Sequence, residues 1–207
     1  MSRTRGSSLV SSLGITVALV CLLAGIAAAQ STYSVTYYSN PNPTKWDSTF
    51  HIVNPGTAVT SINLDGQPLN GNLCAEIYVY NDDEQVVECC GCLLTPDSEK
   101  TLSLNKDLLA NPVNSLEVTT DGVVKIISAL PNSAGKCDPT GDTTIVPTLE
   151  LQNWASHVQA TATNPETEEE FANATLSSLE LEYDERLCSA INTSGSKKGI
   201  CSCGYGD

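Results

Sequence analysis

The sequence predicts a mainly β protein: an antiparallel, immunoglobulin-like β-sandwich with one C-terminal α-helix and disulfide bonds. Apolar and polar residues alternate along most of the chain, as they do in strands with one buried face. Turn-forming residues interrupt this alternation about every 8 to 12 residues, a spacing typical of sandwiches. The chain has 207 residues and nine cysteines, eight of which follow residue 29. An even set of cysteines in an exported chain indicates disulfides.

Residues 1–29 have the composition of a secretory signal peptide. Two arginines supply the positive end, residues 9–27 the apolar stretch and residues 27–29 a small-residue cleavage site. A membrane anchor is the rival interpretation, but the glycines and the alanine-rich end favour cleavage. Cleavage removes Cys21 and leaves residues 30–207 as a single domain. We therefore expect a secreted protein, extracellular or at the cell surface and not attached to the membrane.

The charge of this mature chain is strongly negative. Two basic residues leave with the first 29, so 8 basic residues face 24 acidic ones and the net charge is −16. Such a field repels nucleic acid and anionic lipid, so we expect neither as a partner. Self-association and cell-surface polymers remain open as partners, and no cofactor is expected.

The N-terminal half is expected to consist of strands and one hairpin. Alternating segments predict single strands at these positions: 32–37, 46–52 and 59–64. Two further segments, 73–80 and 85–94, flank the polar tip 81–84 and carry cysteines on both arms. They predict a hairpin.

A second hairpin is predicted around Asp121 and Gly122. These two residues separate the β-rich segments 115–120 and 123–130. An Asp-Gly pair suits a type I′ turn because both residues tolerate positive φ angles. Residues 131–143 follow as a loop rich in Gly, Pro, Asp and Ser.

The C-terminal third is expected to contain one more hairpin and the single helix. Residues 149–163 fit either a helix or a strand, and we favour a hairpin that turns at Asn164-Pro165 because its threonine-rich flanks disfavour a helix. Ser177 and Glu180 form a capping box that predicts a helix over residues 177–190. Apolar residues follow in it at intervals of four, at Leu179, Tyr183, Leu187 and Ile191. The tail after residue 192 is Gly- and Ser-rich.

The cysteines of the mature chain are expected to form structural disulfides. They are Cys74, Cys89, Cys90, Cys92, Cys137, Cys188, Cys201 and Cys203. Neighbours on a strand point to opposite faces, so Cys89 and Cys90 should have different partners while Cys90 and Cys92 share a face. Cys74, on the adjacent strand, is a natural partner for one of these three. Cys188 is expected to link the helix to the sheet, and Cys201 and Cys203 to hold the tail.

Other chemistry for the cysteines is disfavoured. A redox-active Cys-Gly-Cys needs a thiol of low pKa near a cation or a helix N-terminus, and this segment is anionic. Zinc sites favour regularly spaced cysteine pairs or added histidines, and the spacing here is irregular. Asp138 and Asp142 in the 131–143 loop are candidate calcium ligands, although the EF-hand pattern is missing.

No set of catalytic residues is evident in the sequence. His51 is interpreted as a solvated sheet residue and His157 as a hydrogen-bonded structural one. The acidic runs 82–84 and 168–170 are interpreted as solvated faces, and common hydrolase and phosphate-binding motifs are missing. We therefore predict no catalytic residues and no metal ligands. Two sequences, Asn173-Ala174-Thr175 and Asn192-Thr193-Ser194, match the N-glycosylation pattern, which matters only in a eukaryotic host.

Three cysteine-containing motifs resemble those of a family of exported, cysteine-rich bacterial proteins of unknown function, found mainly in soil bacteria. They are Cys74-Ala75-Glu76-Ile77-Tyr78-Val79, Glu88-Cys89-Cys90-Gly91-Cys92 followed by Leu94-Thr95-Pro96, and Gly199-Ile200-Cys201-Ser202-Cys203-Gly204. The resemblance covers residues 70–207. It implies an exported, cysteine-bridged module and transfers no catalytic residues.

Three functions follow from these features. The first is a non-enzymatic structural or adhesive extracellular module, stabilised by disulfides. The second is a self-assembling surface filament subunit, in which the segment with Tyr33, Val35 and Tyr37 pairs with the open sheet edge of another copy. The third is a glycan-active hydrolase, which needs two carboxyl groups across a cleft.

Overall fold

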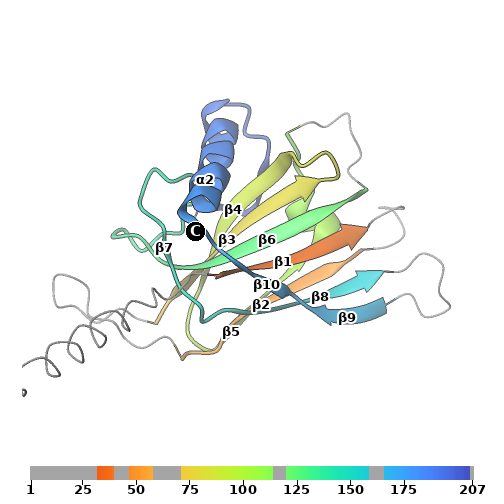
Figure 1. Ribbon diagram of the computed structural model, residues 1–207, viewed down its shortest axis with the longest axis horizontal. Coiled ribbons are helices and arrows are strands. Elements are labelled where there is room, and N and C mark those ends of the chain that lie inside the picture. Colours follow the sequence, from red (N-terminus) through yellow and green to blue (C-terminus); the bar gives the residue numbers. More distant parts are fainter. Residues whose placement is uncertain (1–31, 40–46, 58–70, 114–119, 159–165, 206–207) are drawn as a thin grey trace, which may run out of the picture. The chain divides into compact units, whose positions relative to one another are not determined.

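Eleven strands, one short π-helix and one α-helix make up the part of the chain that the computed structural model describes (Figure 1). The described residues are 32–39, 47–57, 71–113, 120–158 and 166–205. A mainly β fold with one C-terminal α-helix and disulfides is thus confirmed, whereas immunoglobulin-like strand order stays a prediction. Four expected features lie wholly or almost wholly outside the described residues: the signal peptide 1–29, the strand 59–64, the β-rich segment 115–120 and the turn at 164–165.

The larger sheet, sheet A, has the strand order β10-β1-β6-β3-β4-β11, with β7 beside β6. Its antiparallel pairing has one exception, because β11 runs parallel to β4. The all-antiparallel prediction is wrong for that pair. The strands of sheet A are β1 (Thr32–Ser39), β3 (Leu73–Asn81), β4 (Val86–Leu94), β6 (Asp121–Leu130), β7 (Val146–Pro147), β10 (Ala172–Thr175) and β11 (Ile200–Tyr205).

The smaller sheet, sheet B, is antiparallel with the order β5-β2-β8-β9. Its members are β2 (Thr49–Asn54), β5 (Ser98–Ser103), β8 (Gln152–Val158) and β9 (Glu166–Glu170). Pairing of β8 with β9 confirms the hairpin that we favoured over a helix for this region. The π-helix η1 (Leu104–Leu108) follows β5.

The two sheets share one hydrophobic core. Phe50 and Ile52 of β2 belong to the same buried cluster as Ile77 of β3 and Val124 and Ile126 of β6, and all five are at most 1% exposed. Strand alternation explains this arrangement because every second side chain of each strand points to the same face. The inner faces of the two sheets therefore pack against each other.

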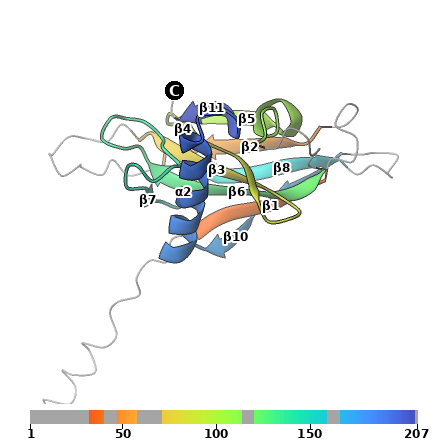
Figure 2. The same ribbon diagram turned by 90° about the horizontal axis from the view of Figure 1, so that it is seen from above.

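The α-helix α2 (Ser178–Thr193) packs on the outer side of sheet A, away from sheet B (Figures 1 and 2). Ser177 caps it, because its hydroxyl accepts a hydrogen bond of 3.1 Å from the backbone N–H of Glu180. The capping box is confirmed, and the helix extends three residues beyond its expected end at residue 190. No helix in the described part of the chain combines the length and apolar character needed to cross a membrane.

The face of α2 that is buried is not the one that the spacing of its apolar residues predicts. Leu179 and Tyr183 are 76% and 43% exposed, whereas Asp184 and Cys188 are fully buried. The face is fixed by bonds to the sheet, since Cys188 forms a disulfide and Asp184 pairs with a lysine of β6. The disulfide and the ion pair therefore decide which face of α2 is buried, and Leu179 and Tyr183 stay exposed.

The predicted turn at Asp121 and Gly122 is wrong, because both residues belong to strand β6. Gly122 pairs with Tyr38 of β1 and Asn81 of β3. A Cβ atom at Gly122 would overlap the carbonyl oxygen of Tyr80 and lie 2.6 Å from the Tyr38 hydroxyl oxygen. Glycine is needed here for close packing of three strands and not for a positive φ angle.

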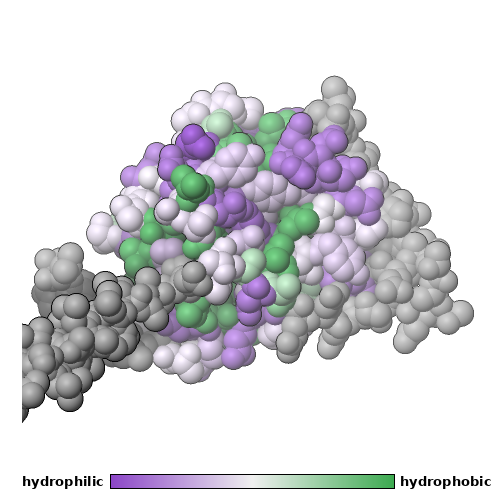
Figure 3. Space-filling view, viewed as in Figure 1, coloured by the Kyte–Doolittle hydropathy of each residue, from purple (hydrophilic) through white to green (hydrophobic). Residues whose placement is uncertain are grey.

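Two other local predictions are confirmed by the structure. Strands β3 and β4 form the expected hairpin, with cysteines on both arms. The Gly- and Ser-rich tail contributes strand β11, which its cysteines hold against β4. On the face drawn in Figure 3, hydrophobic residues are interspersed with hydrophilic ones.

Candidate functional site

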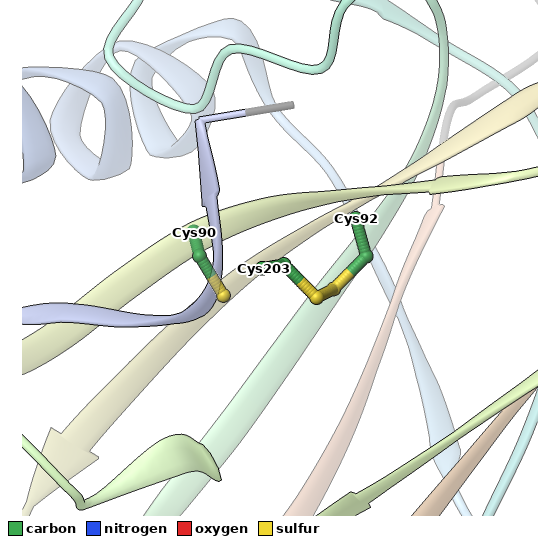
Figure 4. A group of neighbouring side chains, drawn as sticks. All are labelled: Cys90, Cys92 and Cys203. Carbon is green, nitrogen blue, oxygen red and sulfur yellow. A yellow bond between two sulfur atoms is a disulfide. The ribbon is translucent and has the colours of Figure 1, made fainter. Parts of the chain in front are cut away.

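All eight cysteines of residues 30–207 are paired, and three of the four bridges start on β4. Cys89 points to the outer face of sheet A and reaches the helix, while Cys90 and Cys92 point to the core and reach β11. Figure 4 shows the Cys92–Cys203 disulfide and the nearby Cys90. The four pairs are Cys74–Cys137, Cys89–Cys188, Cys90–Cys201 and Cys92–Cys203.

This pattern confirms most of the cysteine predictions. Cys89 and Cys90 have different partners, Cys188 links the helix to the sheet, and the two tail cysteines bond back to the body. The expected pairing of Cys74 with a cysteine of β4 is wrong. Cys74 faces outward and bonds to Cys137, which the loop after β6 carries over the sheet.

A buried ion pair lies between sheet A and α2. The Lys125 side-chain nitrogen, on β6, is 3.0 Å from both carboxylate oxygens of Asp184 on the helix. Glu180, one helical turn earlier, contacts the same nitrogen, and the Tyr80 hydroxyl donates a hydrogen bond to Asp184. The Lys125 nitrogen is 4.9 and 5.0 Å from the ring centroids of Tyr33 and Tyr80. We call these five residues the helix-facing site.

Burial changes the pKa values of the charged groups in this site. Lys125 is 6% exposed and Asp184 is fully buried. Burial raises the pKa of Asp184, although the hydrogen bond from Tyr80 and the Lys125 charge lower it. Burial alone lowers the pKa of Lys125, but the hydrogen bond to Glu180 and the Asp184 charge outweigh it, so that this pKa is raised. Both groups thus retain protons more strongly than they do in water.

A second buried carboxyl group, Glu76 of β3, lies on the same face of the sheet. Glu76 is 2% exposed and its Oε2 has no hydrogen-bond partner among the described residues. It faces Gly91 across the β3–β4 pair, and a Cβ at that position would lie 2.7 Å from Oε2. Burial, with the Asp138 and Glu185 charges, raises its pKa from 4.5 to about 8.

Glu76 is expected to make the protein less stable as the pH rises from about 5 to about 8. Its folded-state pKa of about 8 exceeds the ordinary value of 4.5, so over this interval the folded protein holds a proton that the unfolded chain has released. Denaturant unfolding across this range should show the decline. Glu76→Gln should flatten it by up to about 1.4 kcal/mol per pH unit.

The matched control is Glu182→Gln, at an exposed position of α2, which should leave the slope unchanged. Glu88, whose pKa burial also raises to about 8, contributes a similar decline that both variants retain. A Glu76→Gln protein with the wild-type slope would show that Glu76 is ionised in the folded state.

The histidines lie apart from the helix-facing site. His51, on the outer face of sheet B, stacks on Trp154 at 5.1 Å and its Nδ1 lies 2.8 Å from a Glu99 oxygen. This contact lowers the pKa of Glu99. His157 is buried, stacks on Tyr37 and lies 3.3 Å from the Thr36 hydroxyl. The expected hydrogen bond of His157 is thus confirmed, and its purely structural role stays a prediction.

Within the described part of the chain, Asp138 and Asp142 belong to no group of three side chains close enough to share an ion. The Asp138 carboxylate accepts hydrogen bonds from the Thr140 backbone and hydroxyl, and Asp142 is exposed. Among the described residues, the side-chain groups close enough to share an ion contain cysteines that are bonded in disulfides. The expectation of no metal ligands stays a prediction, with Asp138 and Asp142 as the candidates to test.

The remaining predicted surface features are exposed where the structure describes them. Residues 82–84 are exposed at the β3–β4 tip, and side chains 168–170 lie outside the described set. Asn173 and Asn192 of the glycosylation patterns are both exposed. A groove of about 340 Å³ lies between the β3–β4 tip and α2, next to Tyr183, Leu187 and Ile191.

Sequence reasoning missed the helix-facing site and Glu76. The signals were present, because Lys125 interrupts the apolar segment 123–130 and Glu76 interrupts the segment 73–79. A charged residue inside a strand normally points to solvent, so neither signal shows burial without knowledge of what covers the sheet. Asp184 carried no signal, since acidic residues are common on helix surfaces.

Comparison with known proteins gives no relative for this chain. No protein-family model, curated protein or solved structure matches it. The resemblance to exported, cysteine-rich bacterial proteins therefore stays a prediction.

Proposed function

We propose that the protein is a secreted, non-enzymatic structural or adhesive module, whose role depends on a fold braced by covalent bonds. The observation that carries this proposal is the convergence of three disulfides on β4, which tie the last helix and the last strand to sheet A. Disulfides persist in oxidising compartments, where proteins also meet proteases. Membership of the exported, cysteine-rich family is part of the same proposal.

The buried carboxyl groups do not favour a glycan hydrolase. Glu76 and Glu88 both have a pKa raised to about 8, a property used by general acids. Glu76 lies on the outer face of sheet A, whereas Glu88 pairs with Val79, which points to the core. Side chains on opposite faces cannot flank one glycosidic bond.

The position of β1 favours a module over a filament subunit. Its residues 34–39 pair with β6 and residues 32–35 with β10, so this strand lies within its own sheet. Every residue of β1 has a partner within its own chain, and residues 34 and 35 have partners on both sides, so β1 is not a detached strand that is free to pair with another copy. Size-exclusion chromatography and electron microscopy of the mature protein test this, and filaments would support the assembly hypothesis.

Proteolysis with and without a reductant tests the proposal. We expect the oxidised protein to resist digestion and to have no free thiol, whereas the reduced protein should be cut first at the C-terminal helix and strand. A matched control is Cys74→Ala with Cys137→Ala, which leaves the bridges of β4 in place. In that variant, the first cuts should all fall in the loop 131–145. Equal digestion of the oxidised and reduced wild-type proteins would refute the proposal.

A further inference from the structure

The helix-facing site places a buried primary amine against a buried carboxyl group. We propose that Lys125 and Asp184 react with each other and form an intramolecular amide bond between β6 and α2, with Glu180 as the proton-transfer group. This inference goes beyond the proposed function and does not depend on it.

The geometry places the two reacting groups in contact. The Lys125 nitrogen is 3.0 Å from each carboxylate oxygen of Asp184. An atom at that distance from both oxygens lies within about 3.5 Å of the carboxyl carbon between them, which is the separation from which attack on that carbon starts. The backbones of a central strand and a disulfide-linked helix hold this arrangement. Bonding therefore requires little further loss of conformational freedom.

The surroundings favour condensation over hydrolysis. Asp184 is fully buried, Lys125 is 6% exposed, and the rings of Tyr33 and Tyr80 lie beside the amine. Burial raises the pKa of Asp184 and so favours its protonated form, while the exclusion of water disfavours the return reaction. An amide is uncharged, so its formation removes the cost of keeping two opposite charges in the protein interior.

The reaction is balanced without any other reactant. A proton passes from the Lys125 ammonium to Glu180, and the neutral amine attacks the carboxyl carbon of protonated Asp184. A carbon–nitrogen bond forms, and the carbon–oxygen bond to the hydroxyl breaks. Glu180 returns its proton to the leaving hydroxyl, which departs as one water molecule. The second amine proton passes to solvent, and this balances the proton that Asp184 took from solvent before the attack.

Glu180 is suited to the transfer of these protons. It contacts the Lys125 nitrogen directly and lies one helical turn from Asp184, on the same side of the helix. Its side chain is 37% exposed, compared with 0% for Asp184. It can therefore exchange protons with solvent while the reacting atoms stay covered. The Tyr80 hydroxyl hydrogen-bonds to Asp184 and polarises the carboxyl group.

The bond would add a tether that reductants cannot cleave. Asp184 and Cys188 are one helical turn apart, so α2 would be joined to β6 through the first and to β4 through the second. The helix would stay attached to sheet A after all four disulfides are reduced.

Intact-mass spectrometry of the purified full-length protein, reduced and denatured, tests the proposal. We expect a mass lower than that of the reduced chain by one water molecule, and a branched peptide that joins the Lys125 and Asp184 segments after digestion. A wild-type mass equal to that of the full reduced chain would overturn the proposal. So would a water loss that maps to another pair of residues.

Variants separate the chemistry from folding. Glu180→Gln should abolish or slow the mass loss at least tenfold, whereas Glu182→Gln, on the exposed side of the same helix, should show the wild-type loss. Asp184→Asn keeps a reactive carbonyl and should lose ammonia in place of water. Formation of all four disulfides before reduction shows that each variant is folded. Unchanged water loss in Glu180→Gln would overturn the role of Glu180, and water loss in Lys125→Arg would overturn the role of Lys125.

Discussion

Replacement of all four cysteines that join β4 to β11 by alanine is expected to lower the free energy of unfolding by about 3 kcal/mol. Replacement of only one of these two pairs should cost about 1 kcal/mol or less. The difference has a topological cause. Both bridges span 111 residues of sequence, but they join neighbouring positions on the same two strands. When either one is closed, the other closes only a very short additional loop.

The Cys89–Cys188 bridge further limits how much the two β4–β11 bridges stabilise the protein. It already fixes position 188 beside position 89, so the path to Cys201 runs only through residues 188–201, which are 13 positions apart at their ends. The loop that the two tail bridges close in the unfolded chain is therefore short, and a loop of about 15 residues corresponds to about 3 kcal/mol. Without Cys89–Cys188 the same two bridges should contribute more, nearer about 4 to 5 kcal/mol.

Denaturant unfolding under oxidising conditions measures these effects. The variants are Cys90→Ala with Cys201→Ala, Cys92→Ala with Cys203→Ala, and all four together. Ser202→Ala, at an exposed position of β11, is the matched control and should be neutral. Additive losses of the two pairs would contradict this account, because they would mean that each bridge constrains the unfolded chain independently.

Gly122→Val is expected to destabilise the protein by roughly 3 kcal/mol. A side chain at this position would overlap the Tyr80 carbonyl oxygen and press against the Tyr38 hydroxyl, which itself donates a 3.0 Å hydrogen bond to that carbonyl. Tyr38 is 1% exposed, so its ring has no free volume to enter. In an ordinary strand a β-branched residue would stabilise relative to glycine, so the sign of the change is itself diagnostic.

A double-mutant cycle identifies the clash. Gly122→Ala should destabilise less in a Tyr38→Phe background than in the wild type, because removal of the hydroxyl relieves one of the three close contacts and leaves those with the Tyr80 carbonyl oxygen and the Tyr38 Cζ. Part of the loss should remain, since the backbone carbonyl cannot move away without breaking the sheet. Thermal unfolding of the four proteins measures the coupling. Equal effects of Gly122→Ala in both backgrounds would mean that the hydroxyl is not the obstacle.

Elements whose determinants are local in the sequence were predicted correctly. Ser177 and Glu180 are three residues apart and set the start of α2, and the polar tip 81–84 joins two alternating segments into the β3–β4 hairpin. The faces of Cys89, Cys90 and Cys92 also followed from strand alternation. In each case the interacting groups are close in sequence, so spacing determines geometry.

Features that depend on distant partners were decided by the tertiary structure alone. The Asp-Gly pair at 121 looks like a turn, but Gly122 lies in a strand because β1 and β3 approach it from both sides. Cys74 bonds to Cys137 because the loop after β6 crosses the outer face of sheet A. Lys125 and Asp184 are 59 positions apart and meet only when α2 covers that face. Sequence spacing fixes which side of an element a residue occupies, but the packing of elements, driven by burial of whole faces, fixes what that side meets.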